Sequence, residues 1–179
     1  MPKQVYQVVS GLVRIVRSDG NGNLLILRHV LPGGFFGEEA LIDDGVRRYH
    51  AEAAIETSIK PIEVRKMNAA TTDDLAFDLI DAIGQTYTRI QRISSQRLRN
   101  RLAAALVELA KSPLARRDSR GQILISVTHD ELAAIIGSVR ETTTKAIGEL
   151  VQAGLIKSGY GRLRIINMAA LEQMASECQ

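Results

Sequence analysis

The first third of the chain alternates short apolar runs with turn residues. The runs QVYQVV, LVRIV and LLILRHVL have the length of strands and are rich in β-branched residues, and SDGNGN between the second and the third is typical of a hairpin turn. Two further strand-like runs, YHAEAAI and TSIKPIEV, follow the turn DDG at 43–45. Several short strands at this spacing predict a small barrel or sandwich between Val5 and about Val64.

The period of the apolar residues changes after Met67. They then recur with spacings of four, three, four and three, which is a heptad seam with one polar member: Leu79, Ile83, Thr86, Ile90 and Ile93. Such a seam could pack onto the chain's own barrel, but its narrow width over two heptads favours a two-stranded coiled coil. We therefore predict a helix through which the protein dimerises.

The long helix is expected to break once and then to end at a proline. Ser94 and Ser95 interrupt the apolar face before a new stripe runs from Leu98 to Leu109. Pro113 biases the residue before it away from helical angles, so the second helix should end there. The ARRDSRGQ that follows is predicted to be a charged surface loop.

Residues 128–156, THDELAAIIGSVRETTTKAIGELVQAGLI, contain two helix starts in close succession. Thr128 with Glu131, and Ser138 with Glu141, each match a capping box, in which the hydroxyl accepts an N-terminal amide and the glutamate reaches back. Two helices that begin ten residues apart, with Gly137 between them, must be joined by a tight turn. The segment therefore predicts a helix-turn-helix, with a helical hairpin of no nucleic-acid role as the alternative.

The residues expected to be exposed on the second helix favour DNA. Arg140 and Lys145 can donate to guanine and Glu141 can accept from the cytosine amino group, so these three are candidates for reading bases. The later stretch GLIKSGYGRLRII predicts a basic hairpin, or wing, beside this helix. Hydroxyls and cations that we expect at phosphates or in the wing are Thr128, Ser138, Thr142, Lys157 and Arg162.

The distribution of charge agrees with this interpretation. Residues 1–84 carry 9 Lys and Arg against 12 Asp and Glu, whereas residues 85–179 carry 14 against 8, so the net charge of +3 combines an acidic first part with a basic second part. Such asymmetry indicates that the second part meets a polyanion, although charges spread over a solvated face would give the same count.

Composition excludes several other classes of protein and of site. The single cysteine, Cys178, permits neither a disulfide within the chain nor a cysteine-ligated metal cluster, and His29, His50 and His129 are too scattered to suggest a metal site. The start MPKQVYQVV lacks the basic and long apolar segments of an export signal, and no apolar run approaches the roughly 20 residues of a membrane span. A cytoplasmic protein with no membrane partner is expected by default.

In the order of these parts, nearly the whole chain resembles the CRP/FNR family of bacterial transcription regulators. IIGSVRETTTKAIGEL is similar to the recognition motif of that family, and GGFFGEEAL is similar to the corner of its ligand pocket. The resemblance implies an α+β fold with a cyclic-nucleotide-binding-like β-roll at 1–72, a dimerisation helix and hinge at 73–111, and a winged helix-turn-helix at 112–179. It implies DNA and RNA polymerase as partners and gives Arg140, Glu141 and Lys145 the base-reading role.

One subgroup of the family is particularly similar in sequence. FFGEEAL, RYHAEA, HDELAA and GSVRETTTK resemble the stress-responsive SdrP-type regulators, and this resemblance implies activation without a bound nucleotide.

Two departures from the family bear on the effector pocket. Nucleotide-binding members follow the ribose-binding Gly-Glu, here Gly37 and Glu38, with an Arg and a small hydroxyl residue that take the cyclic phosphate. This chain offers Arg47-Arg48 or Arg48-Tyr49, and neither pair supplies the small hydroxyl. The family also has a helix and further strands before the stretch that matches QVYQVVSGLVRIV, so part of a usual pocket wall is expected to be missing. We therefore expect a vestigial pocket and no cofactor.

The favoured interpretation is a homodimeric, sequence-specific DNA-binding activator that acts on a rough palindrome without a bound nucleotide. One alternative keeps the DNA-binding domain and makes the roll a sensor of cyclic AMP or another small effector. Another is a protein-interaction module that dimerises through the seam and presents its wing to a protein. An enzyme is disfavoured because the sequence shows no convergent nucleophile, base and orienting group, and the adjacent Glu38 and Glu39 suit paired acid–base work poorly.

Overall fold

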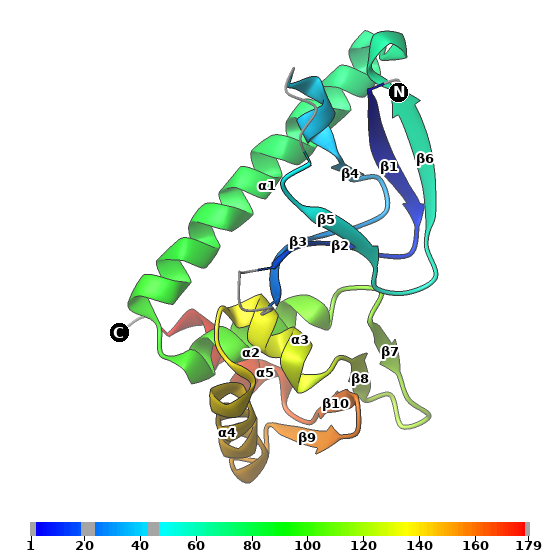
Figure 1. The fold of residues 1–179 in the computed structure, drawn as a ribbon. Coiled ribbons are helices and arrows are strands. Elements are labelled where there is room, and N and C mark those ends of the chain that lie inside the picture. The colour runs from blue at the N-terminus through cyan, green and yellow to red at the C-terminus, as the bar shows by residue number, and fades with distance from the viewer. Residues whose placement is uncertain (1–2, 19–23, 43–46, 178–179) are drawn as a thin grey trace. The chain divides into compact units, whose positions relative to one another are not determined.

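The protein divides into two compact units, residues 1–87 and 88–179, which are described separately (Figure 1). A computed structural model describes residues 3–18, 24–42 and 47–177. Most of the predicted turn SDGNGN, the turn at 43–45 and Cys178 lie outside these residues. Within the described part of the chain, no helix has the length and apolar character needed to cross a membrane.

The first unit holds the predicted strands, arranged as two antiparallel three-stranded sheets. The strand orders are β4-β1-β6 and β3-β2-β5. The prediction of several short strands is confirmed, and β2 pairs with β3 across the predicted SDGNGN hairpin. The strands are β1 Gln4–Ser10, β2 Val13–Ser18, β3 Leu24–Val30, β4 Phe35–Phe36, β5 His50–Ala53 and β6 Ser58–Glu63.

Apolar side chains that alternate along these strands form the core of the first unit. Phe35 is buried with Val5 and with Leu75 of the long helix, while Phe36 joins a neighbouring cluster and stacks on Tyr6 with ring centroids 5.2 Å apart. The short helix η1 (Glu38–Leu41) follows closely on the Phe35–Phe36 strand. Phe35 and Phe36 therefore hold the glycine-rich corner by packing into two different core clusters.

The predicted helices and the break between them are present. Helix α1 covers Ala69–Ser95 and α2 covers Leu98–Leu109. At the break, the hydroxyls of Ser94 and Ser95 each donate to the carbonyl of Gln91, at 2.9 and 2.7 Å, in competition with the backbone ladder. Helix α1 begins in the first unit and ends in the second, whereas α2 lies wholly in the second.

The second unit packs helices against an antiparallel four-stranded sheet of order β7-β8-β10-β9. The loop predicted at ARRDSRGQ is wrong in its first part, because residues 115–117 pair with β8 as an edge strand. The helix α5 was not predicted, although Asn167 caps it by accepting from the Ala170 amide at 3.0 Å. The elements after α2 are β7 Ala115–Arg117, β8 Ile123–Ser126, α3 His129–Ile136, α4 Arg140–Gln152, β9 Ile156–Gly159, β10 Arg162–Ile165 and α5 Met168–Ser176.

One apolar core holds the second unit together. Leu102 and Leu106 of α2 are fully buried with Leu132 of α3, Leu150 of α4 and Leu163 of β10. Helix α2, which the sequence assigned with the dimerisation segment, thus packs into the core on which α3 and α4 rest. The three-part division at residues 72 and 111 stays a prediction.

Candidate nucleic-acid interface

The first helix of the predicted helix-turn-helix begins as its sequence indicates. The Thr128 side chain accepts from the Glu131 amide at 3.2 Å, and the Glu131 carboxylate accepts from the Thr128 amide at 2.7 Å, so the capping box is confirmed. The Thr128 hydroxyl also donates to that carboxylate at 2.9 Å. These bonds fix the backbone at the start of α3.

A glycine in the left-handed conformation ends α3. Gly137 has φ 64° and ψ 52°, and the amide of Ser138 bonds back to the Ala133 carbonyl at 3.0 Å, the long bond of a Schellman turn. A side chain at position 137 would adopt this conformation only with strain. The chain therefore reverses within Gly137 and Ser138, and α4 follows at once.

The predicted capping box at Ser138 is wrong. Val139 is the N-cap of α4, since its carbonyl accepts from the Thr143 amide at 3.0 Å, and no side chain caps this helix. The amide of Ser138 is engaged by the turn that ends α3, so Ser138 lies one residue before the position that a cap requires. Its placement before α4 still leaves the hydroxyl near the N-terminus of that helix.

Helix α4 has one buried face and one exposed face. Thr143, Ala146, Ile147 and Leu150 are buried, whereas Val151 is 38% exposed. Since the buried residues occupy one side, the opposite side is presented outward. The exposed residues on its first two turns are Arg140, Glu141, Thr142, Thr144 and Lys145.

An ion pair joins the starts of the two helices. Arg140 Nη1 lies 2.9 Å from Asp130 Oδ2, and the two side chains are 69% and 60% exposed. A pair this exposed contributes little to stability. Arg140 is therefore directed by Asp130 without being withdrawn from solvent, and it remains accessible to another acceptor.

The predicted wing is confirmed as the hairpin β9–β10. Lys157 pairs with Arg164 and Gly159 with Arg162, and Tyr160 stands fully exposed at the tip. Lys157 and Arg162 are exposed, as a phosphate contact requires. The wing therefore adds a basic edge to the same unit that carries α4.

His129 is a residue of this region that sequence reasoning missed. Its Nδ1 lies 3.1 Å from the hydroxyl oxygen of Thr144 on α4, and its Nε2 lies 3.4 Å from that of Ser158 on β9. The sequence treated it as an ordinary histidine because neither contact is local. The available signal was its position directly after the Thr128 cap, which places it at the start of α3.

The end of α1 is tied to the helix-turn-helix within the second unit. Arg89 Nη2 donates to the Ala134 carbonyl of α3 at 3.0 Å. Desolvation by burial lowers the pKa of Arg89, and the nearby Glu108 opposes that shift. Ile93 lies against Gly137, so the same stretch of α1 contacts the turn between α3 and α4.

Comparison with known proteins identifies the family. A model of the Crp-like helix-turn-helix domain matches residues 100–174, and a model of the cyclic nucleotide-binding domain matches residues 1–73. The transcriptional regulator SdrP of Thermus thermophilus is 46% identical over 172 residues, which cover 96% of this chain and 84% of SdrP. The chain belongs to the CRP/FNR family.

Further similarity supports the fold and bears on the effector. A crystal structure of a CRP/FNR-family transcriptional regulator from T. thermophilus has a TM-score of 0.92 and 46% identity, over 98% of this chain and 89% of that one. The cyclic AMP receptor protein of T. thermophilus is 29% identical, over 96% of this chain and 79% of that protein. This chain is thus a DNA-binding transcription regulator of the CRP/FNR family.

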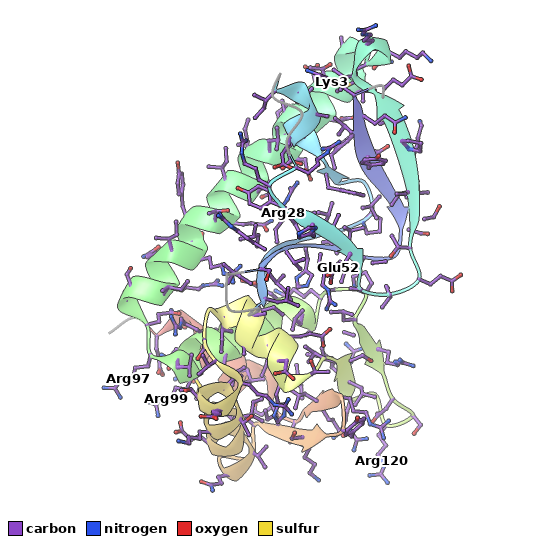
Figure 2. All side chains as sticks on the ribbon, viewed as in Figure 1. Lys3, Arg28, Glu52, Arg97, Arg99 and Arg120 are labelled. Atoms are coloured by element: carbon purple, nitrogen blue, oxygen red, sulfur yellow. The ribbon has the colours of Figure 1, made fainter. Side chains whose placement is uncertain are left out.

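In this CRP/FNR-family regulator, the side chains at the predicted effector corner make contacts with one another and with the backbone. Arg28 of β3, labelled in Figure 2, donates to the Phe35 carbonyl at 2.7 Å and to Asp78 of α1 at 3.1 Å. It also lies 3.5 Å from Glu38, and its side chain is only 15% exposed. Glu38, expected to meet the ribose, is therefore already beside a cation.

The residues predicted at the family's phosphate seat also make contacts within the chain. Arg47 Nη1 donates to the Gly37 carbonyl at 2.7 Å and Nη2 donates to the Gln4 carbonyl at 3.1 Å. The Arg48 amide donates to Glu39 at 2.8 Å, and Tyr49 is 37% exposed. Of the two candidate arginines, Arg47 is the one that turns back onto the Gly37 corner.

The predicted dimer seam needs one correction in this regulator. Leu79 is half-buried against Leu75 in the core of the roll, so it belongs to its own unit. The helix face exposed beside it carries Ile80 and Tyr87, which lie outside the predicted seam. The remaining predicted members, Ile83, Thr86, Ile90 and Ile93, are exposed.

We predict different outcomes for the two proposed caps. Thr128→Ala should lower the free energy of unfolding by about 0.5–2 kcal/mol, because it removes a formed capping box. Ser138→Ala should change it by less than about 0.5 kcal/mol, since Ser138 caps nothing. Urea unfolding of both variants measures the difference, and equal losses would contradict the assignment of Val139 as the N-cap.

Proposed function

We propose that this regulator is a homodimeric, sequence-specific activator that reads its site with α4 and acts without a bound nucleotide. The observation that carries the proposal is the pair of faces on α4, one buried in the core and the other exposing Arg140, Glu141 and Lys145. Loss of sequence preference on changing this exposed face is the decisive test.

The three exposed side chains match the chemistry of base edges. Arg140 and Lys145 are donors for guanine, and Glu141 is an acceptor for the cytosine amino group. They occupy the first two turns of α4, the part of a recognition helix that enters the major groove. A half-site that contains G·C pairs fits this set.

Phosphate contacts are proposed for residues around α4. Ser138 and Thr142 lie at its start, where the helix dipole attracts anions, while Lys157 and Arg162 extend from the wing. Thr128 is the weakest member of the predicted set, because its hydroxyl is engaged by the Glu131 carboxylate. These contacts position the protein on DNA but carry no sequence preference.

A dimer is supported by the exposed apolar stripe along α1. Ile80, Ile83, Tyr87 and Ile90 are 51–69% exposed, and their spacings of three, four and three are those of a heptad seam. Exposed apolar residues in such a row favour a second copy of the helix. Two-fold symmetry would give the DNA site two half-sites about one helical turn apart.

Nucleotide independence is supported by the internal contacts of the roll. Glu38 lies beside Arg28, and the Gly37 carbonyl accepts from Arg47, so two groups expected to meet a nucleotide have partners within the chain. The second candidate, activation by cyclic AMP or another small effector, is favoured by the match of residues 1–73 to the cyclic nucleotide-binding domain.

The activator mode and a contact with RNA polymerase are proposed from the resemblance to the family. Transcription in vitro from a promoter that carries the selected site, with and without the protein, distinguishes activation from repression.

We predict that Arg140→Ala weakens binding to the specific site by roughly 1–3 kcal/mol and relaxes the preference at one G·C pair. Lys157→Ala should instead weaken binding to all sequences alike, because it removes a phosphate contact. Selection of sites from random duplex DNA, followed by titration of matched and mismatched duplexes, measures both effects. A uniform loss for Arg140→Ala would exclude its role as a base reader.

Cyclic AMP is predicted neither to bind measurably nor to change DNA affinity. Calorimetry and DNA titration should use concentrations that saturate the T. thermophilus cyclic AMP receptor protein, which serves as the positive control. Tight binding that raises DNA affinity would replace the nucleotide-independent proposal by the second candidate.

The double variant Ile83→Glu/Ile90→Glu should be monomeric, because it places charges in the middle of the apolar stripe. Light scattering measures the mass, and titration should show a loss of affinity for a palindrome but little change for a single half-site. Ile59→Glu, which changes an exposed isoleucine of β6, is the matched control. A double variant that stays dimeric would show that the dimer forms elsewhere.

A further inference from the structure

We propose that His129 is a positioning residue that holds the recognition helix and the wing in one fixed arrangement on DNA. The inference rests on the proposed function and extends it to a residue with no predicted role. Its imidazole is within hydrogen-bond distance of two hydroxyls on different elements, Thr144 of α4 at 3.1 Å and Ser158 of β9 at 3.4 Å. One side chain from α3 thus meets both parts of the interface.

The base of this side chain is fixed by the structure around it. His129 is the first residue of α3, directly after Thr128, whose capping box sets the backbone at this point. Leu132 in the next turn is fully buried, so α3 cannot roll without losing its core contacts. The backbone that carries the imidazole is therefore held in a fixed position.

Both partners lie where a small shift would move a DNA contact. Thr144 stands on the exposed face of α4, next to the base reader Lys145. Ser158 follows Lys157 on β9, and it pairs in register with Leu163 of β10. His129 thus links the helix that carries a proposed base contact to the strand that carries a proposed phosphate contact.

The place of strand β9 in its sheet makes the His129–Ser158 contact matter for the position of the wing. Among the described residues, the sheet order is β7-β8-β10-β9, so β9 is an edge strand that pairs with β10. Its hairpin tip is held at Gly161, whose carbonyl accepts from the Val127 amide at 3.2 Å. His129 adds a link from the helical side, which reduces the freedom that β9 would lose on binding DNA.

The chemistry of the partners suits a permanent link. A neutral imidazole has one donor and one acceptor nitrogen, and a hydroxyl serves as either partner. Thr144 and Ser158 can therefore satisfy both nitrogens in either tautomer.

The test is a set of double-mutant cycles on DNA binding by the full-length protein. His129→Ala should weaken binding to the selected site roughly 5- to 30-fold, because α4 and β9 would lose the link that holds them in place before DNA binds. Combined with Thr144→Val or with Ser158→Ala, the loss should be less than the product of the single losses, because each pair shares one bond. His50→Ala, in β5 of the other unit, is the control and should leave affinity unchanged.

A conservative variant separates the two halves of the link. His129→Asn keeps a polar atom near the position of Nδ1 and has none at the position of Nε2. It should retain the coupling to Thr144→Val and lose the coupling to Ser158→Ala. A purely structural role would not produce this split, since both couplings would then follow the change in melting temperature.

Two results would overturn the inference. Additive losses, accompanied by a salt slope that falls by about one, would make His129 a direct phosphate contact. Unchanged affinity for His129→Ala would show that the link is dispensable. Failure of the proposed function is seen separately, because the wild-type protein would then show no preference among DNA sequences.

Discussion

The burial of one face of α4 is the constraint on which the DNA interface depends. Ile147 and Leu150 pack with Leu132 of α3 and with α2 in a single core, so α4 cannot turn about its axis without exposing them. Their burial leaves Arg140 and Lys145 facing outward. The exposed chemistry of the proposed recognition helix is therefore set by apolar residues that are buried in the core.

The sequence predicted the order of elements and the reading helix, but it misplaced the start of that helix. The pattern of a hydroxyl residue followed three positions later by Glu occurs at both Thr128 and Ser138, and only the first forms a capping box. The difference comes from Gly137, whose left-handed conformation draws the Ser138 amide back to α3. Local pattern alone does not show which of two neighbouring helices a shared residue serves.

Contacts between distant residues account for two further differences. On α1, periodicity indicated one apolar stripe, while the helix has two: Leu75 and Leu79 pack into the roll, and Ile80 and Tyr87 are exposed beside them. The spacing of apolar residues in the sequence does not show which stripe of the helix packs against which neighbour. His129 was missed for the same reason, because Thr144 and Ser158 are 15 and 29 residues away.

Arg28 forms ion pairs with Glu38 and Asp78, and these contacts support the proposal that the roll acts without a bound nucleotide. Glu38 and Asp78 both lie beside the Arg28 guanidinium, and the three side chains are 30%, 23% and 15% exposed. Without that cation, two partly buried carboxylates would face each other with no opposite charge between them. A nucleotide that bound Glu38 would have to compete with Arg28 for its carboxylate. A side chain tethered 50 residues from Asp78 in the same chain is always present at high effective concentration, whereas a diffusible ligand is not. The Arg28–Asp78 contact thus joins β3 to α1 within the first unit without a ligand between them.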